Sequence, residues 1–219
     1  MKKGIFITFE GSEGSGKSTQ SRALAAYLKS KGYNVLYLRE PGATAIGEKI
    51  RRILLDKVNS SMAETTETLL YMAARAQIVE EKIMPALLRG AIVISDRFLD
   101  STLAYQGYGL GINLKSIESI GEFACAGIKP DLTLIMDLSC SKGLSRVGKV
   151  KDRIESRALS YHERVRIGYL DLARQNQKRI KLIQVKDKES TKKQVIEAVE
   201  EFLRCHFPRY AARIGRLKL

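Results

Sequence analysis

The sequence predicts an α/β fold, in which a parallel sheet of five strands is flanked by helices on both faces. Short apolar runs rich in Ile, Val and Leu alternate along the 219 residues with longer runs of helical periodicity. Strands that alternate with helices pair in parallel, because each helix carries the chain back to the starting edge of the sheet. No internal repeat and no Pro-, Gly- or Ser-rich linker interrupts the chain. We therefore expect one domain over residues 1–219.

The sequence pattern predicts three strands and three helices in the N-terminal half of the chain. Its apolar, β-branched runs are typical of buried strands, and apolar residues three or four apart mark the helices. The longest expected helix covers Thr65 to Leu88, with an apolar stripe from Leu69 to Ile83 that should face the core. In order, the elements are strand 4–9, helix 19–31, strand 34–38, a helix around 46–54, helix 65–88 and strand 91–95.

The C-terminal half continues the alternation and ends in a helix. The carboxyl ends of parallel strands gather at one edge of the sheet, so ligand-binding residues are expected directly after the strands. In order, the elements are helix 114–126, strand 132–136, a charge- and Gly-rich stretch over 140–157, helix 159–175, strand 180–185 and helix 191–203.

The pattern Gly-x-x-x-x-Gly-Lys-Ser runs from Gly11 to Ser18, between the first strand and the first helix. Glycines let the backbone N–H groups wrap around a phosphate, Lys17 adds a cation for the outer phosphates, and the Ser18 hydroxyl can ligate Mg²⁺. The following helix directs the positive end of its dipole at the same charge. The motif therefore predicts a nucleoside triphosphate site formed by Gly11, Ser12, Glu13, Gly14, Ser15, Gly16, Lys17, Ser18 and Thr19.

Charged residues follow two further strands. Arg39 comes directly after the second strand, and Asp96 and Arg97 follow the third. We expect Asp96 to hold the hydration shell of Mg²⁺, and Arg39 and Arg97 to clamp a second phosphate group. The alternative is that Arg39-Glu40 and Asp96-Arg97 are only local ion pairs.

Two other charged features lie beside the predicted phosphate site. The Glu13 carboxylate would be repelled by a triphosphate, so we expect it to point toward a sugar hydroxyl of a second ligand, or else to face solvent. The stretch that contains Arg146, Lys149 and Arg153 is strongly basic. We expect a mobile lid at about residues 141–157, which supplies cations and excludes water. A solvated basic loop is the alternative.

Aromatic residues are few. Tyr71 and Arg75 are four residues apart on the longest helix and so share a face. Tyr105 follows Asp96 by nine residues. Either tyrosine could stack on a base, and packing in the core is the alternative for each.

The net charge of +14 points to phosphate-rich partners, either nucleotides or nucleic acid. No interleaving of aromatic and basic residues supports nucleic acid, and we do not expect it as a partner. The three cysteines are far apart and form neither a disulfide framework nor a zinc motif, so a cytoplasmic setting is expected. No apolar run is long enough to cross a membrane. The basic stretch at about 206–219 is expected to be a solvated tail.

Motifs that run in order from Ile5 to Asp187 together resemble those of thymidylate kinases of the bacterial type with a basic lid. The resemblance implies the P-loop NTPase fold of nucleoside monophosphate kinases, and a reaction in which ATP and dTMP give ADP and dTDP with Mg²⁺, in a homodimer. The motifs are Phe9 through Gln20, Arg39-Glu40-Pro41-Gly42, Arg75-Ala76-Gln77, Asp96-Arg97 with Ser101, residues 104–107, residues 129–133 and Asp152-Arg153-Ile154-Glu155.

The resemblance also implies roles for single residues. Lys17, Arg39, Arg97 and Arg153 would be catalytic, with Arg146 and Lys149 as further lid cations toward ATP. Ser18, Asp96 and Glu155 would lie at the metal. The dTMP site would consist of Glu13 near the sugar 3′-hydroxyl, Arg39 and Arg97 on the phosphate, Tyr71 and Arg75 on thymine, Thr102 at the base edge and Tyr105 under the deoxyribose.

Two alternatives to this function stay open. A nucleoside kinase would use a carboxylate such as Glu40 as the base for a sugar hydroxyl, but would give Arg39 and Arg97 no second phosphate to hold. A nucleic-acid-binding NTPase or a non-catalytic nucleotide-binding module would use the high positive charge. The sequence also departs from the family pattern at Ala43, where a Gly is usual, and at residues 183–185, which leaves the contacts to adenine open.

Overall fold

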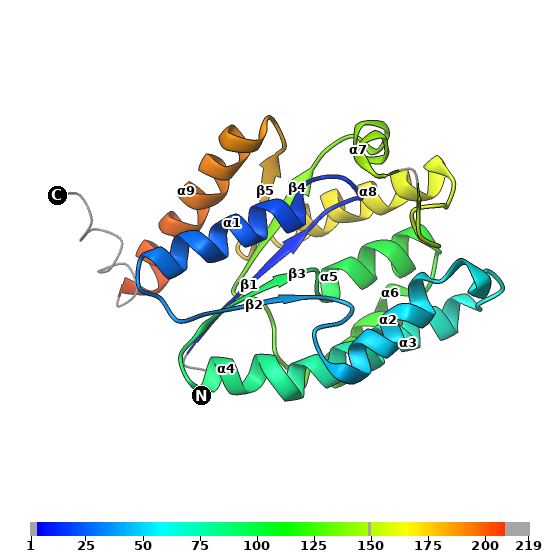
Figure 1. Cartoon of the computed structure of the whole chain (residues 1–219), viewed down its shortest axis with the longest axis horizontal. Coiled ribbons are helices and arrows are strands. Elements are labelled where there is room, and N and C mark those ends of the chain that lie inside the picture. The colour runs from blue at the N-terminus through cyan, green and yellow to red at the C-terminus, as the bar shows by residue number, and fades with distance from the viewer. Residues whose placement is uncertain (1–3, 149, 209–219) are drawn as a thin grey trace.

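The computed structural model describes residues 4–148 and 150–208. Within them, five strands form one parallel sheet, as predicted, and the structure gives their order as β2-β3-β1-β4-β5 (Figure 1). The basic tail expected at 206–219 lies, from residue 209 onward, outside the described residues. The strands are β1 (Ile5–Glu10), β2 (Val35–Arg39), β3 (Ile92–Asp96), β4 (Leu132–Asp137) and β5 (Ile180–Gln184).

Helices cover both faces of the sheet (Figure 1). Side chains alternate along β1, so Ile5, Ile7 and Phe9 pack under α1 (Lys17–Ser30) and α9 (Lys188–His206). The other face is covered by α3 (Glu64–Ile78), α4 (Met84–Leu88), α6 (Leu114–Ala124) and α8 (Leu159–Gln175). Short helices complete the described chain: α2 (Ala45–Leu55), the 3₁₀ turn Lys57–Asn59, α5 (Leu99–Thr102) and α7 (Cys140–Arg146). None of the helices in the described ranges combines the length and the apolarity that crossing a membrane requires.

Helix α3 departs from the sequence prediction in the face that it buries. The expected apolar stripe begins at Leu69, but that side chain is 49% exposed, whereas Glu67 and Arg75 are almost fully buried. The reason is that the inward face of α3 combines apolar residues such as Met72 and Ile78 with two charged residues, whose charges are neutralised by ion pairs with other elements. Helix α3 continues through a π-helical turn (Val79–Ile83) into α4, so the helix predicted over 65–88 is confirmed, with one π-helical turn inside it.

Residues 99–109 form α5 and a π-helical segment (Leu103–Gly109), where the sequence pattern predicts no element. Two glycines in this segment favour a loop in the sequence, but in the structure each lies where a neighbouring helix leaves no room for a Cβ atom. A Cβ at Gly107 would lie 2.4 Å from Leu114, and one at Gly109 would lie 2.6 Å from Tyr161. The segment therefore packs closely against α6 and α8 and brings Tyr105 and Gln106 under the carboxyl edge of the sheet.

Candidate active site

A cavity of about 400 Å³ opens beyond the carboxyl ends of β1, β2 and β3. Its size is that of a site for a small molecule. Most of the residues that the sequence predicts as functional line it. They are Glu13, Gly14, Gly16, Lys17, Ser18, Thr19, Arg39, Tyr71, Arg75, Asp96, Arg97, Thr102, Tyr105, Arg146 and Glu155.

Four of the expected site residues within the described ranges do not line the cavity. Gly11, Ser12 and Ser15 belong to the loop itself, and Arg153 lies behind the wall. Lys149 falls outside the described residues. Several lining residues were not predicted from the sequence, among them Arg51, Ser101, Gln106 and Asp152.

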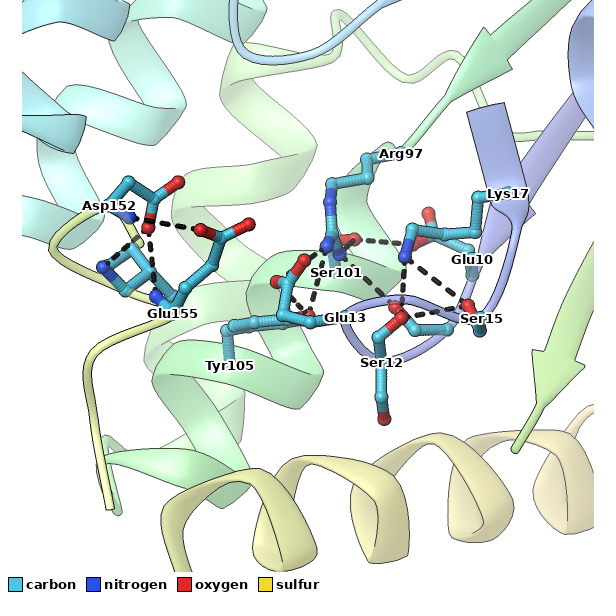
Figure 2. A network of polar contacts seen from close by, with 12 residues as sticks. Glu10, Ser12, Glu13, Ser15, Lys17, Arg97, Ser101, Tyr105, Asp152 and Glu155 are labelled. Atoms are coloured by element: carbon cyan, nitrogen blue, oxygen red, sulfur yellow. Dashed lines mark hydrogen bonds and ion pairs between the residues drawn. The ribbon is translucent and has the colours of Figure 1, made fainter. Parts of the chain in front are cut away.

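The loop between β1 and α1 is folded around the Lys17 ammonium group (Figure 2). Lys17 Nζ donates to the carbonyl oxygen of Ser12 at 2.7 Å and to Ser15 Oγ at 3.4 Å. Burial, and then repulsion by Arg97, lower the pKa of Lys17 to about 8. Gly16 caps α1 in a left-handed conformation (φ 88°) without a side-chain cap, so the first-turn amides of the helix can bind an anion.

Helix α7, at the start of the expected lid, rests directly on this loop. A Cβ at Gly14 would lie 1.9 Å from the carbonyl oxygen of Gly143, and a Cβ at Gly143 would lie 2.2 Å from the carbonyl oxygen of Glu13. Both distances are far below van der Waals contact, so neither position can hold a larger residue without a shift of the backbone. The two glycines therefore bring the lid helix and the phosphate loop into backbone contact.

Arg97 is the most densely bonded residue of the cavity (Figure 2). Its backbone has φ 76°, a strained value for a non-glycine residue, and turns the side chain back over the loop. The guanidinium donates to Glu13 Oε1 at 2.8 Å, to the Tyr105 hydroxyl at 3.0 Å and to Ser101 Oγ at 3.2 Å. It also lies 4.7 Å from the centre of the Tyr105 ring. Arg97 thus does not form the local pair with Asp96 that was the alternative.

Glu13 is ionised and faces the cavity. Burial alone raises its pKa, but the charges of Arg97 and Lys17 and the Tyr105 hydroxyl outweigh burial and lower the pKa to about 2. The alternative that Glu13 faces solvent is therefore wrong. The carboxylate holds Arg97 and remains within reach of a ligand in the cavity.

Arg39 and Arg75 reach the cavity from different sides. Arg39 Nη2 pairs with Glu48 Oε1 at 3.2 Å, and both side chains are partly exposed. Arg75 is fully buried, and its guanidinium donates to Glu40 Oε2, Thr102 Oγ1 and the carbonyl oxygen of Phe98, each at 2.9 Å. The expected alternative of a local Arg39–Glu40 pair is therefore wrong, because Glu40 is bound by Arg75.

A further carboxylate, Glu10, supports the floor of the site and was not predicted from the sequence. It is fully buried at the end of β1. Its Oε1 accepts from the Phe98 N–H at 2.7 Å, and its Oε2 is bonded to the Tyr169 hydroxyl at 3.2 Å and to Ser101. Burial, and then repulsion by Asp100, raise the pKa of Glu10 to about 8. Its partners lie 88 and 159 residues away, so no local pattern could have revealed it.

The residues expected at a metal ion fit Mg²⁺. The Ser18 hydroxyl donates to Asp96 Oδ2, and Asp96 and Glu155 both line the cavity. The described residues contain no group of three or more His, Cys, Asp or Glu side chains that could hold a metal by themselves. Mg²⁺ suits such a site, because it is commonly bound by one or two carboxylates while phosphates and water complete its shell.

The C-terminal part of the expected lid, residues 152–157 (here the lid arm), is bound to the wall of the cavity. Asp152 and Glu155 face the cavity, and Glu155 Oε2 accepts from the Asp152 N–H at 2.9 Å (Figure 2). The Arg153 side chain points the other way: its Nε donates to the carbonyl oxygen of Leu54 at 2.8 Å, and its Nη2 lies 2.6 Å from Glu67 Oε2. The geometry of this structure therefore does not support the expected catalytic cation at Arg153.

Glu67 was not predicted from the sequence as a site residue, although a signal for it exists. Glu67, Tyr71 and Arg75 are spaced by four, so they share one face of α3. Tyr71 and Arg75 line the cavity on this face. Burial, and then the Glu67 charge, raise the pKa of Tyr71 well above its usual range.

Comparisons with known proteins agree on one family. A family model described as thymidylate kinase matches residues 9–196. A thymidylate kinase from Caldanaerobacter subterraneus subsp. tengcongensis is 45% identical over 204 residues, which cover 92% of this chain and 98% of that protein. A thymidylate kinase from Pelobacter propionicus is 51% identical over 178 residues, or 78% of this chain and 81% of that protein.

The fold agrees with these sequence matches. The crystal structure of thymidylate kinase from Ehrlichia chaffeensis superposes with a TM-score of 0.76 at 34% identity, and covers 90% of this chain and 98% of that chain. Because the matches span most of the chain and include the loop, the strand ends and the lid, this chain belongs to the thymidylate kinase family, whose members phosphorylate dTMP to dTDP.

Proposed function

We propose that this chain binds ATP on the loop 11–19 and dTMP in the adjoining part of the cavity, and transfers the γ-phosphoryl group from one to the other. The observation that carries the proposal is that Lys17, Arg39 and Arg97 line one cavity together with the phosphate-binding loop. Two anions can share such a cavity only where fixed cations neutralise their repulsion.

The reaction needs positioning more than acid–base chemistry. A bond forms between an oxygen of the dTMP phosphate and the γ-phosphorus of ATP, while the bond from that phosphorus to the β–γ bridging oxygen breaks. The attacking oxygen is already anionic at neutral pH, so no general base is required. Arg97 and Arg39 would hold the acceptor phosphate in line, and Lys17 would hold the outer phosphates of the donor.

The donor side would also hold a metal ion. Ser18, Asp96 and Glu155 are proposed to bind Mg²⁺, which neutralises phosphate charge when it is bound. Arg146 at the end of α7 and Lys149 are proposed as lid cations of a single kinase domain over residues 1–219. The cavity-lining position of Arg146 supports its part of this proposal.

The acceptor side offers groups suited to a pyrimidine nucleotide. We assign thymine to the wall made by Tyr71, Arg75 and Thr102, where the two planar side chains can stack on the ring and bond its edge. We assign the deoxyribose to Tyr105 and Glu13, because the ionised Glu13 carboxylate can accept from a 3′-hydroxyl. The bond between Glu40 and Arg75 speaks against a nucleoside kinase, since it occupies the carboxylate that would act as base.

We also propose that the chain forms a homodimer through α2, α3 and α6. Helix α3 packs against both of the others. All three expose apolar side chains: Ile46 and Ile53 on α2, Leu69 on α3, and Ile120 and Phe123 on α6. A second copy of the chain that covers this face would remove these side chains from water. The free thiols of Cys125, Cys140 and Cys205 fit the reducing cytoplasm in which we expect the enzyme to work.

A coupled assay tests the function. Purified protein with ATP and Mg²⁺ is given dTMP, dUMP, thymidine or no acceptor, and ADP release is followed. We expect turnover with dTMP to exceed that with every other acceptor. Turnover with thymidine but not with dTMP would establish the nucleoside kinase instead, and equal ADP release without any acceptor would indicate an NTPase.

A further inference from the structure

The Glu67 side chain is fully buried on α3, where it accepts two hydrogen bonds and forms an ion pair with a third side chain, all from two other segments. Gln106 Nε2 donates to its Oε1 at 2.9 Å. On the other oxygen, Oε2, Arg157 Nη2 donates at 2.7 Å and Arg153 Nη2 pairs at 2.6 Å. One carboxylate thus faces two guanidinium groups and an amide, away from solvent.

Both guanidinium groups come from the lid arm, residues 152–157. The arm has other attachments as well: the Arg153 N–H donates to the carbonyl oxygen of Leu55 at 3.1 Å, and the Arg157 guanidinium lies 4.6 Å from the centre of the Tyr161 ring. Asp152, directly before Arg153, accepts with its Oδ1 from the N–H groups of Ile154 and Glu155, which lie between the two arginines. The arm is therefore a closed turn whose buried side meets Glu67 while Asp152 and Glu155 face the cavity.

The third partner connects Glu67 to the acceptor side. Gln106 is almost fully buried and lines the cavity, as does Tyr71, one helical turn after Glu67. The same carboxylate thus bonds the wall where we assign thymine and the arm that carries the proposed metal ligand Glu155. In the interior such a charge is stable only while its cations are in place, so the arm and the wall stay docked together.

We propose that Glu67 is a positioning residue, which holds the lid arm 152–157 on the acceptor wall and thereby sets Asp152 and Glu155 at the cavity. Arg153 and Arg157 attach the arm to Glu67, and Gln106 connects Glu67 to the proposed acceptor site. The catalytic part of this inference rests on the proposed function, but the docking of the arm does not. The lid then has two fixed ends, α7 on the phosphate loop and the arm on α3, with residues 147–151 between them.

The test compares Glu67→Gln with wild type in the full chain. The substitution keeps the shape and an acceptor for Gln106 but removes the charge that holds two arginines. Hydrogen–deuterium exchange of the ligand-free protein should show the amides of residues 152–157 exchanging about tenfold faster, with β1 and β4 unchanged. In the dTMP assay, kcat should fall about tenfold while the KM for ATP changes much less.

Matched variants separate this role from general stability. Glu64→Gln removes an exposed carboxylate from the first turn of the same helix and should leave arm exchange and kcat as in wild type. If Glu67→Gln does not fold, Arg157→Gln removes one anchor and keeps the Arg153 pair, and should still speed exchange of the arm. Wild-type exchange of the arm in the folded variants would overturn the proposal. Because exchange is measured without substrates, a wild-type protein inactive on dTMP would refute the proposed function alone.

Discussion

The Arg97 guanidinium and the Glu13 carboxylate form a 2.8 Å ion pair that joins the end of β3 to the phosphate-binding loop. Arg97 also donates to Tyr105, Ser101 and the carbonyl oxygen of Gly11, so its planar group is fixed by acceptors on several sides. An ammonium group has a single donor nitrogen and cannot reproduce this set. The pair therefore fixes the direction of the Arg97 guanidinium, which we propose binds the acceptor phosphate.

Arg97→Lys tests this arrangement. It should lower kcat/KM for dTMP about 100-fold, because the cation is kept but the phosphate is misplaced. The KM for ATP should change much less, since Lys17 and the loop are untouched. Steady-state kinetics with each substrate varied in turn measure both effects, and a wild-type kcat/KM for dTMP would refute the positioning role of Arg97.

The buried carboxyl of Glu10 should give the stability of the protein a distinct pH dependence. In the unfolded chain the group ionises near its ordinary pKa of 4.5, whereas in the folded protein burial raises the pKa to about 8. Between these values the folded state binds the extra proton. The Glu10 contribution is thus fully present at low pH, and it falls as pH rises, by up to about 1.4 kcal/mol per pH unit.

Glu10→Gln isolates this contribution. The amide can still accept from the Phe98 N–H and can donate to Ser101 or Tyr169, so the fold should be kept. Urea unfolding from about pH 5 to about pH 8 should show a smaller fall in the free energy of unfolding for the variant than for wild type. Parallel curves for the two proteins would mean that Glu10 is ionised throughout this range.

The backbone contact between Gly143 and the phosphate loop predicts the effect of Gly143→Ala. Alanine favours a helix over glycine by about 1 kcal/mol, so helix propensity alone would stabilise α7. The new Cβ, however, would lie 2.2 Å from the carbonyl oxygen of Glu13 and force α7 off the loop. We expect kcat to fall about 100-fold, because the loop no longer holds the donor in line.

Gly148→Ala is the control for this variant, because no atom of the described residues outside its chain neighbours lies within 4 Å of the position of its Cβ. It should change kcat much less than Gly143→Ala does. Equal kinetics for the two variants would contradict the argument from close packing.

Phe123 tests the proposed dimer. The side chain is 87% exposed on α6, where a large apolar group gains from being covered. Phe123→Glu should reduce the mass measured by light scattering to that of one chain. Val150→Glu replaces a side chain that is 91% exposed in the lid and should leave the mass unchanged. A dimeric Phe123→Glu protein would place the interface elsewhere.

The parts of the fold that local patterns determine could be predicted from the sequence. The five strands, the phosphate-binding loop and the residues after β2 and β3 follow from apolar runs and a motif contained in neighbouring residues. The lining of the cavity by Lys17, Arg39 and Arg97 follows in turn, because parallel strands end at one edge.

Other features depend on contacts between distant residues, and local patterns do not contain them. Arg153 was expected in the cavity because it is a cation in a basic stretch, but its direction is set by Glu67 and Leu54, both far earlier in the chain. Likewise, the glycines of residues 103–109 indicate a loop unless their neighbours on α6 and α8 are known. The partner of a buried charged residue can therefore be identified only once the whole fold is known.

Both the inner and the outer face of helix α3 carry residues to which we assign a role. Its inner face carries Tyr71 and Arg75, and Leu69, two residues from Tyr71, points outward. Because both sets of residues lie on one helix, we expect a displacement of α3 from its outer side to move Tyr71 and Arg75 in the cavity wall as well. Substitutions on the outer face, whether they arise by evolution or by design, are thus constrained by the inner-face residues that we propose bind the base.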